Sequence, residues 1–163
     1  MSLSVSRATA LRNAARSVLA PDAVSEKTLT QPAARDRYPL IVQAALKLRK
    51  TSFVIDGEAV VLRPDGISDF AALYSGKRNA EVRLYAFDLL ADTGVDMREE
   101  TLLIRKLWLG KLLKRATDGI MLNEHEAGEI GPALFQQACK MGLEGIVSKR
   151  SDRPCKAGHS PVG

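Results

Sequence analysis

The chain has 163 residues, of which 45% are hydrophobic and 26% charged, so it is long enough for one domain with a core or for a large part of a bigger one. No apolar run could cross a bilayer, and Arg7, Arg12 and Arg16 interrupt the N-terminal apolar residues, which argues against a signal peptide and for a cytoplasmic location. Cys139 and Cys155 are too few and too far apart for a zinc site, and the net charge of +5 is compatible with a polyanionic partner.

Residues 1–35 differ from the rest of the chain, and we expect a helix followed by a linker. Apolar residues recur there at helical spacing, and Pro21 would end the helix. Residues 22–32 are mixed polar sequence without a period. The main domain is therefore expected to span residues 36–163. The apolar positions of the expected N-terminal helix are Ala8, Leu11, Ala15, Val18 and Leu19.

The remaining sequence alternates helical and strand patterns. Within the expected strand from Glu81 to Leu90, alternation places Leu84, Ala86 and Asp88 on one face, and Tyr85, Phe87 and Leu89 on the other. The order of elements favours an α+β fold with antiparallel and mixed sheets that carry helices on their outer faces. Helices are expected from Asp36, Ser68, Thr101 and Glu129, and strands over residues 81–90, 120–122 and within 142–150. Residues 52–62 indicate either two strand segments joined at Asp56-Gly57 or one strand bent there.

Acidic residues interrupt two of the expected strands. Asp56 and Glu58 break an apolar run, and because an unpaired buried carboxylate is costly, they should lie at a strand end or face a polar pocket. In the last strand, strict alternation would place Glu144 and Lys149 on opposite faces. A bulge at Gly145 would instead bring both side chains to the opening of one site. An edge strand with solvated charged ends explains the same residues.

Three segments give these features a common meaning. They are residues 54–60 (Val-Ile-Asp-Gly-Glu-Ala-Val), 84–90 (Leu-Tyr-Ala-Phe-Asp-Leu-Leu) and 144–150 (Glu-Gly-Ile-Val-Ser-Lys-Arg). In this order and spacing, the sequence from about Asp36 to Pro161 resembles the nucleotidyltransferase core of ATP-dependent DNA ligases, above all the ligase module of bacterial end-joining ligases. The resemblance implies an ATP-grasp-like adenylation domain of twisted, mainly antiparallel sheets flanked by helices. It also implies ATP and Mg²⁺ as cofactors and the joining of nicked duplex DNA in repair and recombination.

The resemblance also implies roles for single residues. Glu58 would lie near the ribose and the metal-phosphate region, Phe87 would stack on adenine, and Asp88 would orient the site. Glu144 would help to hold the divalent metal, and Lys149 would lie near the phosphates. Without the flanking motifs, Phe87 has the alternation of a core residue, and both glutamates could be strand-end acids.

Basic residues follow the last motif. Arg150, Arg153 and Lys156 could contact the phosphate backbone of DNA, or they could form a solvated basic loop.

The nucleophile of the family is missing from this sequence. It is a lysine in a Lys-x-Asp-Gly motif, and no such string occurs here. The nearest string, Arg63-Pro64-Asp65-Gly66, has an arginine, lies downstream and indicates a turn. We also expect the C-terminal Lys-x-Lys motif and the oligonucleotide-binding domain to be lost, and Cys155 and His159 stand where Tyr and Arg are usual. The chain alone is therefore expected not to form the lysine adenylate.

Three functions remain open at this point. The protein could be a ligase-family member that is inactive alone or active only with missing parts. It could be a non-catalytic nucleotide or DNA binder that keeps the old pocket. It could also be a structural remnant or a protein-interaction module, which could self-associate through apolar surface exposed by truncation.

Overall fold

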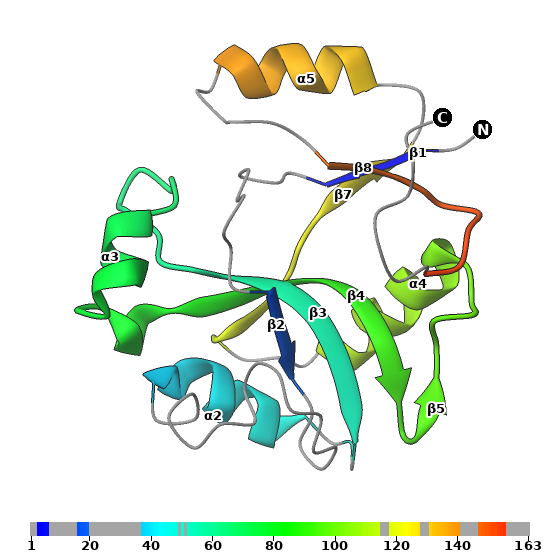
Figure 1. Cartoon of the computed structure of the whole chain (residues 1–163), viewed down its shortest axis with the longest axis horizontal. Helices are drawn as coiled ribbons and strands as arrows, with labels where there is room; N and C mark the ends of the chain where they lie inside the picture. Colours follow the sequence, from blue (N-terminus) through cyan, green and yellow to red (C-terminus); the bar gives the residue numbers. More distant parts are fainter. Residues whose placement is uncertain are drawn as a thin grey trace.

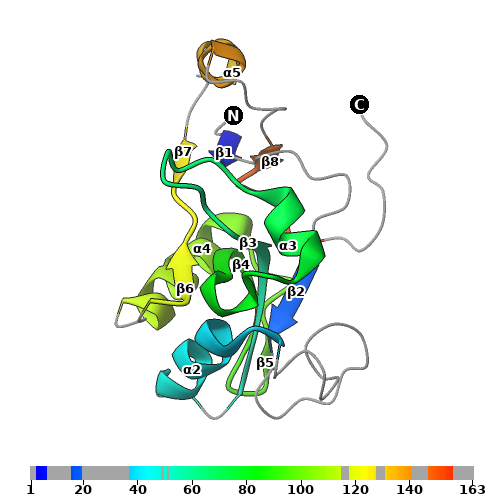
Figure 2. The ribbon, with the colours of Figure 1, turned by 90° about the vertical axis from the view of Figure 1, so that its left-hand side faces the viewer.

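The computed structural model of the chain describes residues 3–6, 16–19, 37–48, 50, 52–114, 118–127, 131–140 and 147–155. The described strands form two sheets, and helices lie against them (Figures 1 and 2). This arrangement confirms the predicted α+β class. None of the helices in the described part of the chain is long and apolar enough to span a bilayer.

The larger sheet has five strands, with the long antiparallel pair of β3 (Phe53–Val60) and β4 (Arg83–Asp92) at its centre. Strand β3 is one continuous strand, and its register with β4 shifts twice, between Val54 and Ile55 and between Asp56 and Gly57. Strand β2 (Arg16–Leu19) pairs with β3, β5 (Val95–Asp96) pairs with the end of β4, and β6 (Ile120–Leu122) runs parallel to the start of β4.

The smaller sheet joins three distant parts of the sequence. Strand β1 (Leu3–Ser6) lies between β7 (His125–Ala127) and β8 (Val147–Arg150), and both neighbours are antiparallel to it. Only Asn123 and Glu124 separate β6 from β7, so the chain passes directly from one sheet to the other (Figure 1).

The helices begin and end where local chemistry allows. Helix α2 starts with Pro39 at a position that tolerates proline, although its N-cap is Tyr38 and not the predicted Asp36. The side chain of Asp69, and not of Ser68, accepts a hydrogen bond from the Ala72 amide and caps α3. The helices are α2 (Pro39–Lys47), α3 (Phe70–Ser75), the short 3-10 helix η1 (Asn79–Glu81), α4 (Leu102–Leu113) and α5 (Gly131–Lys140).

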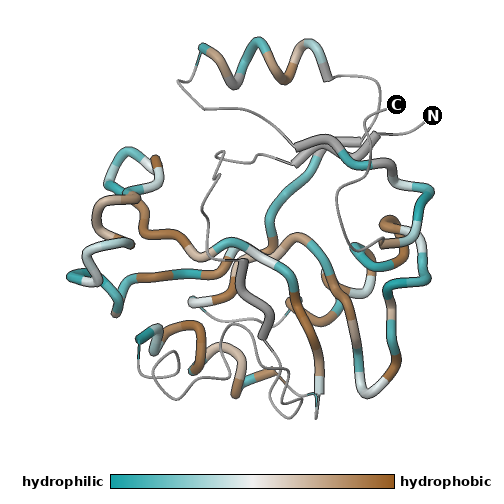
Figure 3. Tube along the Cα trace, in the orientation of Figure 1, coloured by the Kyte–Doolittle hydropathy of each residue, from teal (hydrophilic) through white to brown (hydrophobic). Residues whose placement is uncertain are grey.

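The core lies between the larger sheet and its helices. Hydrophobic residues gather along β3, β4 and α2 (Figure 3). Burial of these side chains supplies most of the stabilisation, at about 25 cal/mol per Å² of apolar surface. Helix α5 lies instead beside the smaller sheet (Figures 1 and 2). Fully buried core residues include Ile41 of α2, Ile55 and Ala59 of β3, Leu84 and Leu89 of β4, Leu109 of α4 and Ile120 of β6.

The predicted N-terminal helix is wrong for residues 16–19. They form β2, in which Val18 pairs with Asp56 and Leu19 with Ile55. Helical spacing of apolar residues is a weak preference that tertiary pairing overrides, and the edge of β3 offers a full row of backbone partners. The rest of that prediction, residues 7–15, lies outside the described residues.

Candidate functional site

A β-bulge in β4 sets the geometry of the candidate site. Gly57 pairs with Ala86 and Asp56 pairs with Asp88, so Phe87 is an extra residue on β4 between two ladder pairs. A bulge of this kind bends the strand and redirects its side chains. Phe87 is half-buried at this bend.

The bulge also corrects the predicted faces of β4. Directly opposite residues of an antiparallel pair share a face, and Ile55 pairs with Leu89, both fully buried. Leu89 therefore joins Leu84 and Ala86 in the core, whereas Asp88 lies on the other face, opposite Asp56. The prediction had these two residues exchanged, because the inserted Phe87 moves the side chains that follow it to the other face, up to the second register shift at Leu90.

Position 57 has no space for a side chain, so it requires glycine. A Cβ atom at position 57 would lie 2.9 Å from Leu84 Cδ1 and 2.9 Å from the carbonyl oxygen of Tyr85. Real Cβ atoms essentially never approach backbone so closely, and the Tyr85 carbonyl is part of the ladder. The Asp-Gly step of the first motif thus allows β3 and β4 to meet closely beside the bulge.

Phe87 and Lys149 come together in space although they lie far apart in the sequence. Lys149 Nζ is 4.7 Å from the centroid of the Phe87 ring, within the range of a cation–π contact. Phe87 belongs to the larger sheet and Lys149 to β8 of the smaller one, so this contact joins the two sheets. The Lys149 side chain is otherwise exposed.

Glu58 contributes a buried acceptor. It lies on β3 opposite Tyr85, on the neighbouring strand to Phe87, and its Oε1 atom has no hydrogen-bond partner in the described part of the chain. Burial raises the pKa of Glu58 from 4.5 to about 7. A buried oxygen of this kind is satisfied when a ligand hydroxyl or amide donates to it.

A buried ion pair lies behind Phe87. Arg105 of α4 donates from Nε to Asp88 Oδ1 at 2.7 Å and from Nη2 to Asp88 Oδ2 at 2.9 Å. Its Nη1 donates to the carbonyl oxygen of Glu100 at 2.6 Å, and the Leu89 amide donates to Asp88 Oδ1. Asp88 is therefore tied to α4, and this tie holds the helix against the bulge.

Lys106 is a further cation next to the bulge. Its side chain is buried, and Nζ donates to the carbonyl oxygen of Phe87 at 3.4 Å. Burial lowers the pKa of the Lys106 ammonium; the Asp88 carboxylate opposes this shift, and the positive charges of Lys149 and Arg105 add to it. Lys106 thus lies close enough to Lys149 for the two charges to interact.

The sequence interpretation missed Arg105 and Lys106, although a signal was present. Leu102, Leu109 and Leu113 define the buried side of α4, and positions 105 and 106 complete the same side at helical spacing. Two cations at apolar positions indicate buried carboxylate or carbonyl partners.

Two predicted site residues, Glu144 and Lys156, lie outside the described residues, as does the side chain of Arg150. Arg153 is exposed on the loop after β8, and its carbonyl oxygen accepts a hydrogen bond from the Leu102 amide at 3.1 Å. That loop therefore docks on the start of α4. Among the residues that the structure describes, no cluster of three His, Cys, Asp or Glu side chains could hold a metal ion.

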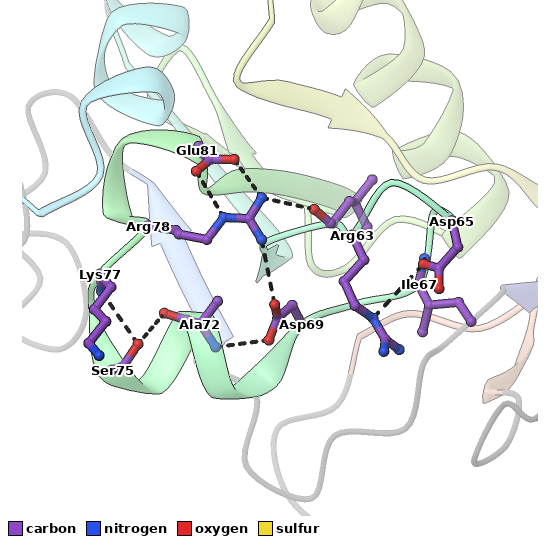
Figure 4. Close-up of polar contacts among 10 residues, drawn as sticks. Arg63, Asp65, Ile67, Asp69, Ala72, Ser75, Lys77, Arg78 and Glu81 are labelled. Carbon is purple, nitrogen blue, oxygen red and sulfur yellow. Dashed lines mark hydrogen bonds and ion pairs between the residues drawn. The ribbon is translucent and has the colours of Figure 1, made fainter.

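The string nearest to the missing nucleophile motif forms a turn, as predicted. The Gly66 amide donates to the Arg63 carbonyl at 2.9 Å. The Ile67 amide donates to Asp65 Oδ1 at 2.9 Å, as Figure 4 shows. Arg78 holds the following segment by binding Glu81 and Asp69 (Figure 4). This region is built as a connection between β3 and β4.

The family of the chain follows from its sequence profile. The profile described as "ATP dependent DNA ligase domain" matches residues 25–160, which is most of the chain and includes β3, β4 and β8. The chain belongs to this family. The match begins upstream of Asp36, and it confirms the predicted resemblance.

Individual relatives agree with this assignment. The chain is 32% identical over 118 residues to the multifunctional non-homologous end joining protein LigD of Pseudomonas aeruginosa, covering 71% of this chain and 14% of LigD. It is 29% identical over 154 residues to a probable DNA ligase of Mycolicibacterium vanbaalenii, covering 87% of this chain and 28% of that ligase. The chain thus spans less than a third of either relative.

Solved structures show the same fold. The chain matches mycobacterial DNA ligase D complexed with ATP and MES with a TM-score of 0.63 and 31% identity, over 76% of this chain and 40% of the other. It matches the ligase domain of Mycobacterium tuberculosis LigD with a TM-score of 0.63 and 30% identity, again over 76% and 40%. The predicted adenylation-domain fold is confirmed.

Proposed function

We propose that this chain keeps the adenine-nucleotide site of an ATP-dependent DNA ligase. The observation that carries the proposal is the contact between Lys149 Nζ and the Phe87 ring, because it unites an aromatic platform and a cation from two separate motifs. The neighbouring strand adds Glu58, whose buried acceptor has no hydrogen-bond partner among the residues that the structure describes.

These three groups match the parts of a nucleotide. A purine stacks on an aromatic ring with a gain of about 1–3 kcal/mol. A base that takes the face of Phe87 now in contact with Lys149 displaces the ammonium, which can then pair with a phosphate. Glu58 Oε1 can accept a hydrogen bond from a ribose hydroxyl, which satisfies the orphaned oxygen.

Magnesium belongs to the same proposal. When bound, Mg²⁺ neutralises phosphate charge, and it takes oxygen ligands. We assign Glu144 as its protein ligand on the strength of the family motif. Titration of ATP with and without Mg²⁺, repeated with Glu144→Gln, tests this assignment: Glu144→Gln should remove the effect of magnesium and leave metal-free binding unchanged.

Nicked duplex DNA is the proposed macromolecular partner. Arg153 is exposed, and the excess of positive charge suits a phosphate backbone, with Arg150 and Lys156 as further contacts. Binding should weaken steeply as salt rises, and salt-independent binding would contradict it. A DNA substrate and bacterial relatives support a cytoplasmic location.

We further propose that the polypeptide of these 163 residues does not adenylate itself. It contains no Lys-x-Asp-Gly, and Arg63, in the nearest string, stays protonated and so cannot attack the α-phosphate. Incubation with α-labelled ATP and Mg²⁺, followed by a denaturing gel, should give no labelled protein band. A covalent band would contradict the proposal, and its loss in Lys106→Arg would identify the buried Lys106 as the acceptor.

A further inference from the structure

Helix α4 is apolar on two opposite sides. Its inner side, with Leu102, Leu109 and Leu113, is buried in the protein. Its outer side also carries large apolar residues, of which Leu103 is 62% and Leu107 58% exposed. A contiguous exposed strip of large apolar side chains is typical of an association surface, so the outer side calls for a partner.

The exposed apolar residues form one continuous strip. Leu103 and Leu107 are four residues apart, and Ile104 and Trp108 follow the same spacing, so all four lie on one face of the helix. We call these four residues the outer α4 face. Helix α4 lies on one side of the molecule, beyond β4 (Figures 1 and 2).

The two ends of this face carry opposite charges. Glu99 and Glu100 are exposed just before the helix begins, and Lys111 and Lys114 are exposed at its other end. Lys111 Nζ lies 4.5 Å from the centroid of the Trp108 ring, so this cation borders the apolar strip directly. The face therefore has an acidic end, an apolar centre and a basic end.

We propose that the outer α4 face joins two copies of this chain, with their α4 helices antiparallel around a two-fold axis near Leu107. This arrangement places apolar centre against apolar centre, and it places the acidic end of each copy beside the basic end of the other. A parallel arrangement would set like charges together. The face is thus complementary to itself in the antiparallel orientation only. We therefore infer that its partner is a second copy of the chain.

The contact is small, so the dimer should be weak and should be populated only at high protein concentration. One helix face per copy falls at the lower end of specific interfaces, below about 1,200 Å² in total, where complexes are weak. The large apolar side chains near the axis, above all Trp108, should contribute most of the binding free energy.

Sedimentation equilibrium of the full chain over a wide concentration range tests the proposal. The wild type should pass from monomer to dimer, and Leu107→Glu should weaken the dimer at least about tenfold, because it buries charge at the axis. Leu46→Glu on α2, where Leu46 is 77% exposed, is the matched control and should dimerise like the wild type. Both substitutions are at exposed positions, and circular dichroism checks that both variants fold.

Charge reversal tests the orientation separately. Glu100→Lys alone and Lys114→Glu alone should each weaken the dimer, and the double variant should recover it. A wild type that stays monomeric throughout, a dimer that survives Leu107→Glu, or a double variant no better than the single ones would each overturn the proposal.

Discussion

Arg105 of α4 donates hydrogen bonds to both carboxylate oxygens of Asp88 on β4, at 2.7 and 2.9 Å, and both side chains are almost completely buried. Asp88 directly follows Phe87, the extra residue of the bulge. The ion pair therefore links α4 to the bulge in β4 at which the Phe87 ring is positioned. It can thereby act on nucleotide binding through the position of Phe87.

Asp88→Asn should destabilise the protein strongly. The substitution leaves Arg105 buried and charged without its anionic partner, which costs about 3–5 kcal/mol of the free energy of unfolding. Urea denaturation measures this loss. The matched control is Asp118→Asn, which removes a similar pair with Arg83 at 2.9 Å, where Asp118 is 71% exposed and the loss of stability should be much smaller. Equal losses in the two variants would contradict the assigned role.

Glu58→Gln should change how stability depends on pH. The carboxyl titrates near 4.5 when unfolded and near 7 when folded, so between these values the native state binds more protons. The free energy of unfolding of the wild type should therefore fall as pH rises through this window. Glutamine does not titrate, so the variant should gain about 1–3 kcal/mol relative to the wild type between pH 4.5 and 7.5, the lower part of this range reflecting partial solvent screening.

Urea denaturation of both proteins at a series of pH values measures this difference. Parallel stability curves would show that Glu58 is not held in a desolvated position. In addition, saturating nucleotide should reduce the difference if a ribose hydroxyl satisfies Glu58 Oε1.

Gly57→Ala should destabilise the β3–β4 ladder by about 1–3 kcal/mol, because the new Cβ would overlap the Tyr85 carbonyl and Leu84. Gly110→Ala is the matched control, since nothing lies within 4 Å of a Cβ at position 110 and alanine favours a helix. Thermal unfolding should show a lower midpoint for the first variant and an equal or higher one for the second. A Gly57→Ala protein as stable as the wild type would contradict the close approach of the strands.

The sequence predicted most of the architecture but not its irregularities. Periodicity located α4 and the β3 and β4 strands, because their apolar positions repeat over many residues. The bulge at Phe87 left no sign in the alternation and reversed the faces of Asp88 and Leu89. An inserted residue in one strand depends on what the partner strand offers, which no single segment records.

The candidate site was predicted only in part. The meeting of Phe87 and Lys149 followed from motifs that the family keeps together, and the structure places the two side chains in contact. The role of each in nucleotide binding stays a prediction. Arg105 and Lys106 were overlooked because charged residues on a helix are ordinarily assigned to the solvent side. Their burial depends on partners from β4, Asp88 and the Phe87 carbonyl.

Equilibrium titration of the full chain with ATP tests the retained nucleotide site most directly. The wild type should bind saturably, Phe87→Ala should weaken binding at least about tenfold, and Lys149→Met should weaken it and reduce its dependence on salt. Lys111→Met, which removes the comparable contact with Trp108, should leave the affinity unchanged. The absence of saturable binding by a folded wild type, or an unchanged affinity in Phe87→Ala, would contradict the account.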